Sequence, residues 1–306
     1  MVKPSSEEVY LRKPFSLSLL DQFIPPFYLP LMFFYTKPNG SHLDTVQTLA
    51  GLKKSFSKAL NQYYPLSGRT IDNRCIGSYD KGVPYVEARV RGCLADCIAQ
   101  TEQEWMKQLL PTQPFCSIPA STSPQLTIQI NIFDCGGIAI VMCFSHKVVD
   151  AAGNLIVYVV STYNSGERDI ELDHLAYLVR EAIDICEDQI SRLQSGDVTK
   201  FTRDQYNRLI DISARGEVDF FGCTSWLNTL DGKLVDFGWG EPTSLRMWRS
   251  ESRYYSFGDG FVLKETGKGI GMEAVITLDT KTMHILEHNS DFLAIASGSY
   301  PNRTMV

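Results

Sequence analysis

Two apolar segments joined by a short glycine-containing turn constrain the fold of this chain more than any other feature. Residues 126–132 alternate strictly between apolar and polar side chains, which is the pattern of a strand with one buried and one polar face. Residues 137–144 form a continuous apolar run, which is typical of a buried strand. The segment Asp134–Gly137 between them has the composition of a turn. The sequence therefore predicts a β-hairpin whose second strand is buried.

A histidine stands where this buried strand ends. His146 follows Phe144 and Ser145, at the point where we expect the chain to leave the core, and Asp150 lies four residues further on. The unperturbed pKa of imidazole, about 6.5, suits general-base work at neutral pH. The spacing alone is a weak signal, because the number of His-x-x-x-Asp matches expected by chance in a chain of this composition is about one-third. A structural or solvated histidine is the alternative.

A second candidate segment, residues 235–242, has the sequence Val-Asp-Phe-Gly-Trp-Gly-Glu-Pro. Two glycines flank a tryptophan, and an aspartate precedes a phenylalanine. A tight loop that packs two aromatic side chains explains this pattern without any chemistry, and such a loop more often shapes a site than reacts.

Composition limits the classes of function. A chain of 306 residues with 44% hydrophobic residues can bury one large core or two smaller ones. Its net charge of -6 argues against a general nucleic-acid or anionic-membrane binder. None of the 8 cysteines forms a Cys-x-x-Cys pair, and Cys93 and Cys97 have no matching second pair, so no metal site is predicted. We expect reduced thiols and a cytoplasmic protein.

No membrane segment is predicted. Residues 1–13 are polar and lack the apolar core of a signal peptide. The apolar stretch 23–35 is shorter than the roughly 20 residues a spanning helix needs, and three prolines interrupt it. We expect it to lead into a core strand at 31–35.

Periodicity predicts the remaining elements. The predicted helices are 43–63, 151–163, 174–193, 200–213 and 281–288. The further predicted strands are 83–90, 252–257, 260–263 and 271–278.

Five segments in order resemble the plant BAHD acyltransferase family, and within it the vinorine-synthase-like, alkaloid-acetylating branch. They are Tyr64–Arg69, Gly82–Ala88, Phe133–Gly137, the His-x-x-x-Asp segment 146–150 and the Asp-Phe-Gly-Trp-Gly segment 236–240.

The resemblance implies an α/β fold of two chloramphenicol-acetyltransferase-like domains with mixed sheets and helices, the second of them truncated. The N-terminal domain would be residues 1–168 and the truncated C-terminal domain residues 169–306, leaving open whether part of 236–257 pairs with the first. The match jumps near residues 164–174, where a block of about 100 residues is missing relative to the family. That block would carry the arginine partner of Asp150. Its loss would expose sheet edges that favour self-association.

The resemblance also implies a reaction. An acyl group, expected to be acetyl, would pass from acyl-CoA to a hydroxyl or amine of a plant specialised metabolite. His146 would be the catalytic base and would need no covalent acyl-enzyme. Asp150 would orient the His146 segment, and Trp239 is a candidate oxyanion donor, although packing is the favoured role. The residues implied to support the site structurally are Asp150, Asp236, Gly238, Trp239 and Gly240.

Acyl-CoA is thus the expected co-substrate, with no permanently bound cofactor and no metal. No residue is assigned to binding it. The partners would be acyl-CoA and a small-molecule acceptor, with neither nucleic acid nor membrane. The alternative is a catalytically impaired truncated paralogue or splice form that acts only as a binding or interaction protein. A histidine-dependent hydrolase is disfavoured, because no Gly-x-Ser-x-Gly segment is present.

Overall fold

The computed structural model describes most of the chain outside its middle third. The described residues are 1–18, 21–22, 24, 27–36, 45–99, 104–112, 123–149, 221–225, 235–247, 259–265 and 271–296, with isolated helical positions between 177 and 211. Residues 1–152 and 222–306 form one compact unit, and residues 153–221 form another. The proposed domain boundary at residue 168 falls outside the described residues and stays a prediction, as do helix 151–163 and strand 252–257.

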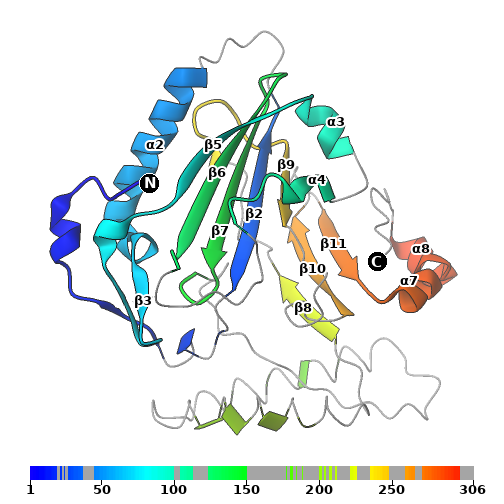
Figure 1. The fold of residues 1–306 in the computed structure, drawn as a ribbon. Coiled ribbons are helices and arrows are strands. Elements are labelled where there is room, and N and C mark those ends of the chain that lie inside the picture. Colours follow the sequence, from blue (N-terminus) through cyan, green and yellow to red (C-terminus); the bar gives the residue numbers. More distant parts are fainter. Residues whose placement is uncertain are drawn as a thin grey trace. The chain divides into compact units, whose positions relative to one another are not determined.

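A five-stranded mixed sheet is the centre of the larger unit (Figure 1). In spatial order its strands are β5 (Tyr85–Val90), β6 (Leu126–Phe133), β7 (Ile138–Ser145), β2 (Tyr28–Tyr35) and β9 (Ser244–Met247). Strands β5 and β6 run parallel, and the other neighbours run antiparallel.

The predicted hairpin is confirmed. Strands β6 and β7 pair antiparallel with Ile130 opposite Ile140. In the turn, the amide of Gly136 donates to the carbonyl of Phe133 at 2.8 Å. Gly136 has a φ of 82°, a left-handed conformation that glycine adopts without strain.

Strand β2 begins earlier than the predicted segment 31–35 and contains Pro30. Among the described residues, β9 pairs only with Leu31–Phe34 of β2. Pro30 therefore lies where the strand has a single described neighbour, β7. Proline has no N–H to donate to a sheet ladder. It is tolerated at such a position because one side of the strand has no neighbour that needs a donor.

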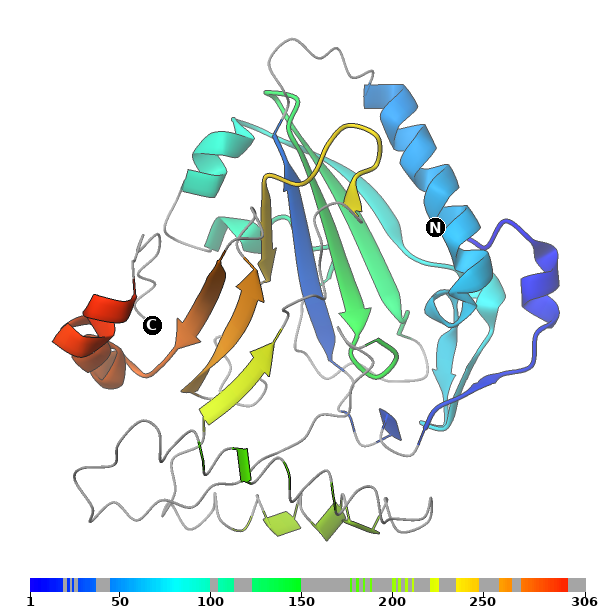
Figure 2. The same cartoon turned by 180° about the vertical axis from the view of Figure 1, so that it is seen from behind.

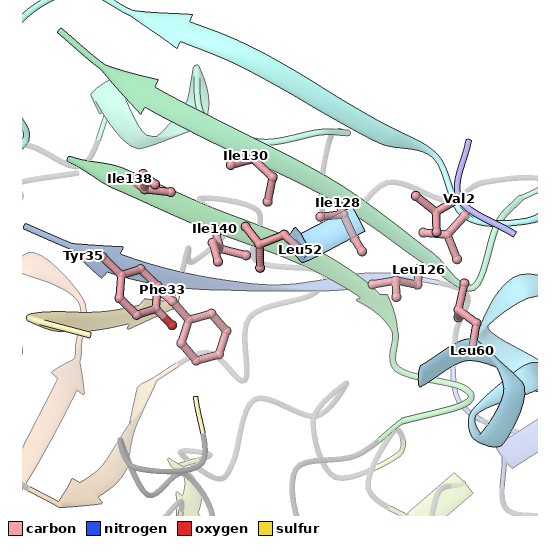
Figure 3. Close-up of a cluster of buried hydrophobic side chains, with 11 residues drawn as sticks. Val2, Phe33, Tyr35, Leu52, Leu60, Leu126, Ile128, Ile130, Ile138 and Ile140 are labelled. Atoms are coloured by element: carbon pink, nitrogen blue, oxygen red, sulfur yellow. The ribbon is translucent and has the colours of Figure 1, made fainter. Parts of the chain in front are cut away.

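Helix α2 (Thr45–Gln62) covers one face of the sheet and confirms the predicted helix 43–63. Leu52 and Leu60 of the helix belong to one buried cluster with residues of β6 and β7, in which Leu52 lies near Ile140 and Leu60 near Leu126 (Figure 3). The apolar spacing of three and four residues therefore forms a packing face, as the periodicity indicated. The buried residues of this cluster are Val2, Phe33, Tyr35, Leu52, Leu60, Val83, Leu126, Ile128, Ile130, Ile138 and Ile140.

The opposite face of the sheet is covered as well. Met106 in α4 (Glu104–Lys107), and Leu94 at the start of α3 (Leu94–Ala99), pack against Met32, Phe34 and Val141. The polar side chains of β6 on this face are consequently buried: Thr127, Gln129 and Asn131. The amide of Asn131 donates to the carbonyl of Leu109 at 3.1 Å, and Gln129 donates to Asn131 at 2.8 Å. Hydrogen bonds of this kind make the burial of polar groups tolerable.

The remaining described strands form two three-stranded sheets. One has the order β1 (Phe15–Ser16), β4 (Cys75–Gly77), β3 (Arg69–Ile71). The other has the order β11 (Met272–Thr277), β10 (Asp259–Glu265), β8 (Phe221–Ser225), seen from behind in Figure 2. Strands β10 and β11 pair antiparallel and confirm the predicted strands 260–263 and 271–278.

Five short helices are also described. They are η1 (Glu7–Leu11), η2 (Tyr64–Ser67), η3 (Tyr79–Lys81), α7 (Thr280–Glu287) and α8 (Ser290–Ile295). Helix α7 confirms the prediction for 281–288, and the side chain of Asp279 caps it by accepting from the Lys281 and Thr282 amides. In the parts that the structure describes, no helix has the length and apolarity to cross a membrane.

Apart from Phe221, the first residue of β8, the smaller unit is described at isolated helical positions. Those between 177 and 188 agree with the predicted helix 174–193, and those between 200 and 211 agree with the predicted helix 200–213. Arg180 and Asp184 form an ion pair of 3.0 Å one helical turn apart.

Candidate active site

His146 lies directly after β7 in a tight turn. The amides of Val148 and Val149 both donate to the carbonyl of Ser145, at 3.0 and 3.3 Å, which reverses the chain around the histidine. The amide of His146 itself donates to the carbonyl of Phe27 at 3.1 Å. Its backbone is therefore fixed to the residue that precedes β2.

The imidazole of His146 is half-buried. Its ring lies beside the ring of Phe27, with 5.3 Å between centroids and 42° between planes, and the Nδ1 atom is shielded from solvent. One edge of the ring is thus enclosed by protein, while the residue retains partial exposure. Asp150 lies outside the described residues.

Lys147 is a buried cation beside this histidine. Its side chain is 3% exposed, and Nζ donates to the carbonyls of Asp21 and Gln22 at 3.0 and 3.2 Å. Burial lowers the pKa of Lys147, and the nearby Asp21 carboxylate partly opposes that shift. No sequence pattern marks Lys147 as a buried residue, because a lysine next to an apolar strand is normally exposed.

The side chain of Asp236 stabilises the 235–240 loop by hydrogen bonds within the loop. Its Oδ1 atom accepts hydrogen bonds from the amides of Gly238 and Gly240, at 2.7 and 2.9 Å. These hydrogen bonds, with Gly240 contributing most, hold the pKa of the carboxyl below its ordinary value. Gly238 and Gly240 have φ of 96° and 107°, so both positions favour glycine.

Tyr35 docks this loop on the end of β2. Its hydroxyl donates to the carbonyl of Val235 at 2.8 Å. Its ring meets those of Trp239 and Phe237 edge-on, at 6.0 and 6.1 Å. Burial raises the pKa of Tyr35 and the Asp236 carboxylate raises it further, so the phenol stays protonated and able to donate. Trp239 packs against the cluster under α2, and its buried Nε1 has no hydrogen-bond partner among the described residues.

The structure places the two motif segments at opposite ends of one strand. Phe27, which binds the His146 backbone, precedes β2, and Tyr35, which holds the loop around Trp239, ends it. At about 3.3 Å per residue, the span from Phe27 to Tyr35 is about 26 Å. The indole of Trp239 is therefore remote from the imidazole of His146. Strand β2 lies between the two segments.

No metal-binding cluster occurs among the described residues, in the sense that no three His, Cys, Asp or Glu side chains converge there. Five cysteines whose side chains the structure describes are free of disulfides: Cys75, Cys93, Cys97, Cys135 and Cys143.

Comparison with known proteins gives consistent results for the first half of the chain. The model of the Transferase family matches residues 1–169. Stemmadenine O-acetyltransferase of Catharanthus roseus is 38% identical over 154 residues, which are 49% of this chain and 37% of the relative. Vinorine synthase of Rauvolfia serpentina is 39% identical over 153 residues, 49% of this chain and 36% of the relative. The chain thus spans little more than a third of the length of the curated relatives it matches.

Similar folds occur among solved structures. The crystal structure of vinorine synthase aligns with a TM-score of 0.66 at 22% identity, covering 97% of each chain. The structure of F. sporotrichioides TRI101 complexed with coenzyme A and T-2 aligns with a TM-score of 0.55 at 14% identity, covering 92% of this chain and 98% of the other. At these identities the likeness concerns the fold, which is the predicted α/β arrangement of mixed sheets and helices.

Proposed function

This chain belongs to the Transferase family, the BAHD acyltransferases, and we propose that it transfers an acyl group from acyl-CoA to a hydroxyl of a plant specialised metabolite, with His146 as general base. The single observation that carries the proposal is the position of His146. Its half-buried ring stands at the end of a core strand, in a turn that is hydrogen-bonded to Phe27.

The proposed step needs one base and no protein nucleophile. With Nδ1 enclosed, Nε2 is the nitrogen that takes the proton from the acceptor hydroxyl. The acceptor oxygen then attacks the thioester carbonyl, a C–O bond forms and the C–S bond breaks. The imidazolium returns its proton to the departing coenzyme A thiolate.

Lys147 and Asp236 support the site without touching substrate. Lys147 ties the turn that carries His146 to the backbone of residues 21–22, so it fixes where the imidazole can lie. Asp236 closes its own loop about 26 Å away along β2. We assign Trp239, Gly238 and Gly240 to that same structural role, and Asp150 to orientation of the His146 segment.

The names of the relatives support a proposal for the acyl group and the acceptor class. Stemmadenine O-acetyltransferase and vinorine synthase are among the similar proteins, so we propose acetyl-CoA as donor and an alkaloid-like alcohol as acceptor. We also propose a cytoplasmic location, and self-association through the sheet edges that a missing central block would leave exposed.

The test is a coenzyme A thiol-release assay on purified, monodisperse protein, with acetyl-CoA and a panel of alcohols. The His146→Ala variant is expected to lose transfer by at least about 100-fold while its folded fraction stays that of wild type. The exposed His284, in α7, is the matched control, and its replacement by Ala leaves transfer unchanged. Full activity in His146→Ala would overturn the general-base assignment.

An inactive wild-type chain would favour the second candidate. The match to little more than a third of each relative is the observation behind it, because an active site needs the surroundings that hold its groups in place. In that case the chain would bind acetyl-CoA, measured by calorimetry, without releasing thiol.

A further inference from the structure

Three thiols gather where the β6–β7 hairpin meets α3. Cys135 lies in the hairpin turn and is exposed, whereas Cys93 and Cys97 are partly buried. Cys93 immediately precedes α3, and Cys97 lies one helical turn on, its amide donating to the carbonyl of Cys93 at 3.2 Å. By contrast, Cys143 is fully buried inside β7.

Short contacts hold the hairpin turn against the start of α3. The amide of Leu94 donates to the sulfur of Cys135 at 3.3 Å, and the amide of Gly92 donates to the carboxylate of Asp134 at 3.1 Å. A Cβ at Gly137 would lie 2.8 Å from the Cβ of Leu94, so the two backbones approach as closely as a glycine permits. The sulfur of Cys135 is therefore fixed at the start of α3, beside Cys93, which precedes Leu94 in the chain.

The surroundings of Cys135 favour its thiolate. Partial burial raises the pKa of the Cys135 thiol, but hydrogen bonds from the Leu94 and Gly137 amides and from the Cys93 thiol outweigh it, so the pKa lies below the ordinary value. Burial raises the pKa of Cys97, with Asp96 adding to the effect, and raises that of Cys143 to about 12. Of these thiols, Cys135 combines exposure with stabilisation of the reactive anion.

We propose that Cys135 and Cys93 form an oxidisable dithiol pair, a modification site in which Cys135 reacts first and Cys93 resolves it. The thiolate of Cys135 attacks a hydroperoxide, the O–O bond breaks, and a sulfenic acid and an alcohol or water form. The thiol of Cys93 then attacks the sulfenic sulfur, releasing water and closing a disulfide. The sum is two thiols and one hydroperoxide giving one disulfide, one water and one alcohol or water. An exposed low-pKa thiol next to a second cysteine is the arrangement such chemistry uses.

The pair is independent of the proposed transferase reaction. Cys135 precedes β7 and His146 follows it, so the length of that strand, roughly 27 Å, separates them. The disulfide would tie the hairpin turn to the start of α3, and cellular dithiols would reopen it by exchange.

The experiment treats the reduced 306-residue chain with hydrogen peroxide, blocks the remaining thiols with N-ethylmaleimide and maps tryptic peptides by mass spectrometry. We expect a cross-link between peptides 92–107 and 108–147 that dithiothreitol removes. Cys135→Ser and Cys93→Ser abolish it, whereas Cys97→Ser and Cys116→Ser retain it. A cross-link that survives in Cys93→Ser, or wild-type protein in which Cys135 proceeds to a sulfinic acid without a cross-link, would overturn the proposal.

A second readout needs no variant. In the folded wild-type chain, limiting iodoacetamide is expected to label Cys135 at least roughly ten times faster than Cys97 or Cys143. Equal rates for Cys135 and Cys97 would contradict the assignment of Cys135 as the first thiol to react.

Discussion

The amide of His146 donates a hydrogen bond of 3.1 Å to the carbonyl of Phe27, and the rings of these two residues lie 5.3 Å apart. The residue that the proposed reaction requires is thereby held by the backbone that leads into β2. The next residue, Lys147, binds the carbonyls of Asp21 and Gln22, so two successive residues of the turn are tied to the same stretch of chain.

Replacing Lys147 by Met tests whether this second tie positions the histidine. Methionine keeps the apolar stem but leaves the carbonyl of Asp21 without its donor and the carbonyl of Gln22 with the Asn73 amide alone, so we expect about 1–3 kcal/mol lower stability in urea unfolding. Thiol release per folded molecule is expected to fall, with kcat more affected than KM. The control is Lys54→Met on the exposed side of α2, which is expected to stay within about 0.5 kcal/mol of wild type. Unchanged kcat in Lys147→Met would remove its positioning role.

Replacing Tyr35 by Phe isolates the hydrogen bond that docks the 235–240 loop. The ring contacts with Trp239 and Phe237 remain, while the bond to the carbonyl of Val235 is lost, at a cost of about 0.5–1.5 kcal/mol. Tyr10→Phe is the matched control, because its hydroxyl donates to the carbonyl of Pro4 far from that loop. Limited proteolysis should cut near residue 240 faster in Tyr35→Phe alone. Identical cleavage in the two variants would show that the hydroxyl does not hold the loop.

The lowered pKa of the Asp236 carboxyl leads us to predict that the stability of the fold depends on pH. Its pKa in the folded chain is lowered by hydrogen bonds, led by that from Gly240. A carboxylate of this kind stabilises the fold above its unfolded pKa, about 3.9, and loses that contribution as the pH falls through the folded value. Asp236→Asn retains an acceptor oxygen without the charge. The difference in unfolding free energy between wild type and this variant should therefore shrink as the pH falls below about 4.

Glu241→Gln, on the same exposed loop, is the control for that series, because Glu241 shows no hydrogen bond among the described contacts. If the two variants changed in parallel with pH, the hydrogen bonds to Asp236 would not be the cause.

Two glycines give opposite predictions for the same substitution. Gly51 lies within α2, and a methyl group added there would meet only open space, so Gly51→Ala should stabilise the chain by about 0.5–1 kcal/mol. At Gly137 the added methyl would collide with the buried Leu94, so Gly137→Ala should destabilise by about 1–3 kcal/mol. Thermal unfolding of both variants beside wild type checks the signs, and a shift in the same direction for both would contradict this packing.

Much of the sheet was predictable, because strand and helix periods are local. The hairpin that joins β6 and β7, and the helix over residues 45–62, follow from the spacing of apolar side chains along each segment. The pairing of β9 with β2 could not be derived in this way. Leu31 and Met247 lie opposite one another although they are far apart in the sequence, and no short-range pattern encodes such a partner.

The candidate site shows the same division. Local sequence patterns marked His146 and the loop from Asp236 to Gly240 as candidates, and the family resemblance supplied the roles expected of them. Folding alone decided that β2 separates them and that Lys147 is buried against the carbonyls of Asp21 and Gln22. It also decided that the polar face of β6 is covered. Distances and burial depend on which segments meet when the chain closes on its core, and that is a property of all the contacts together rather than of any one stretch.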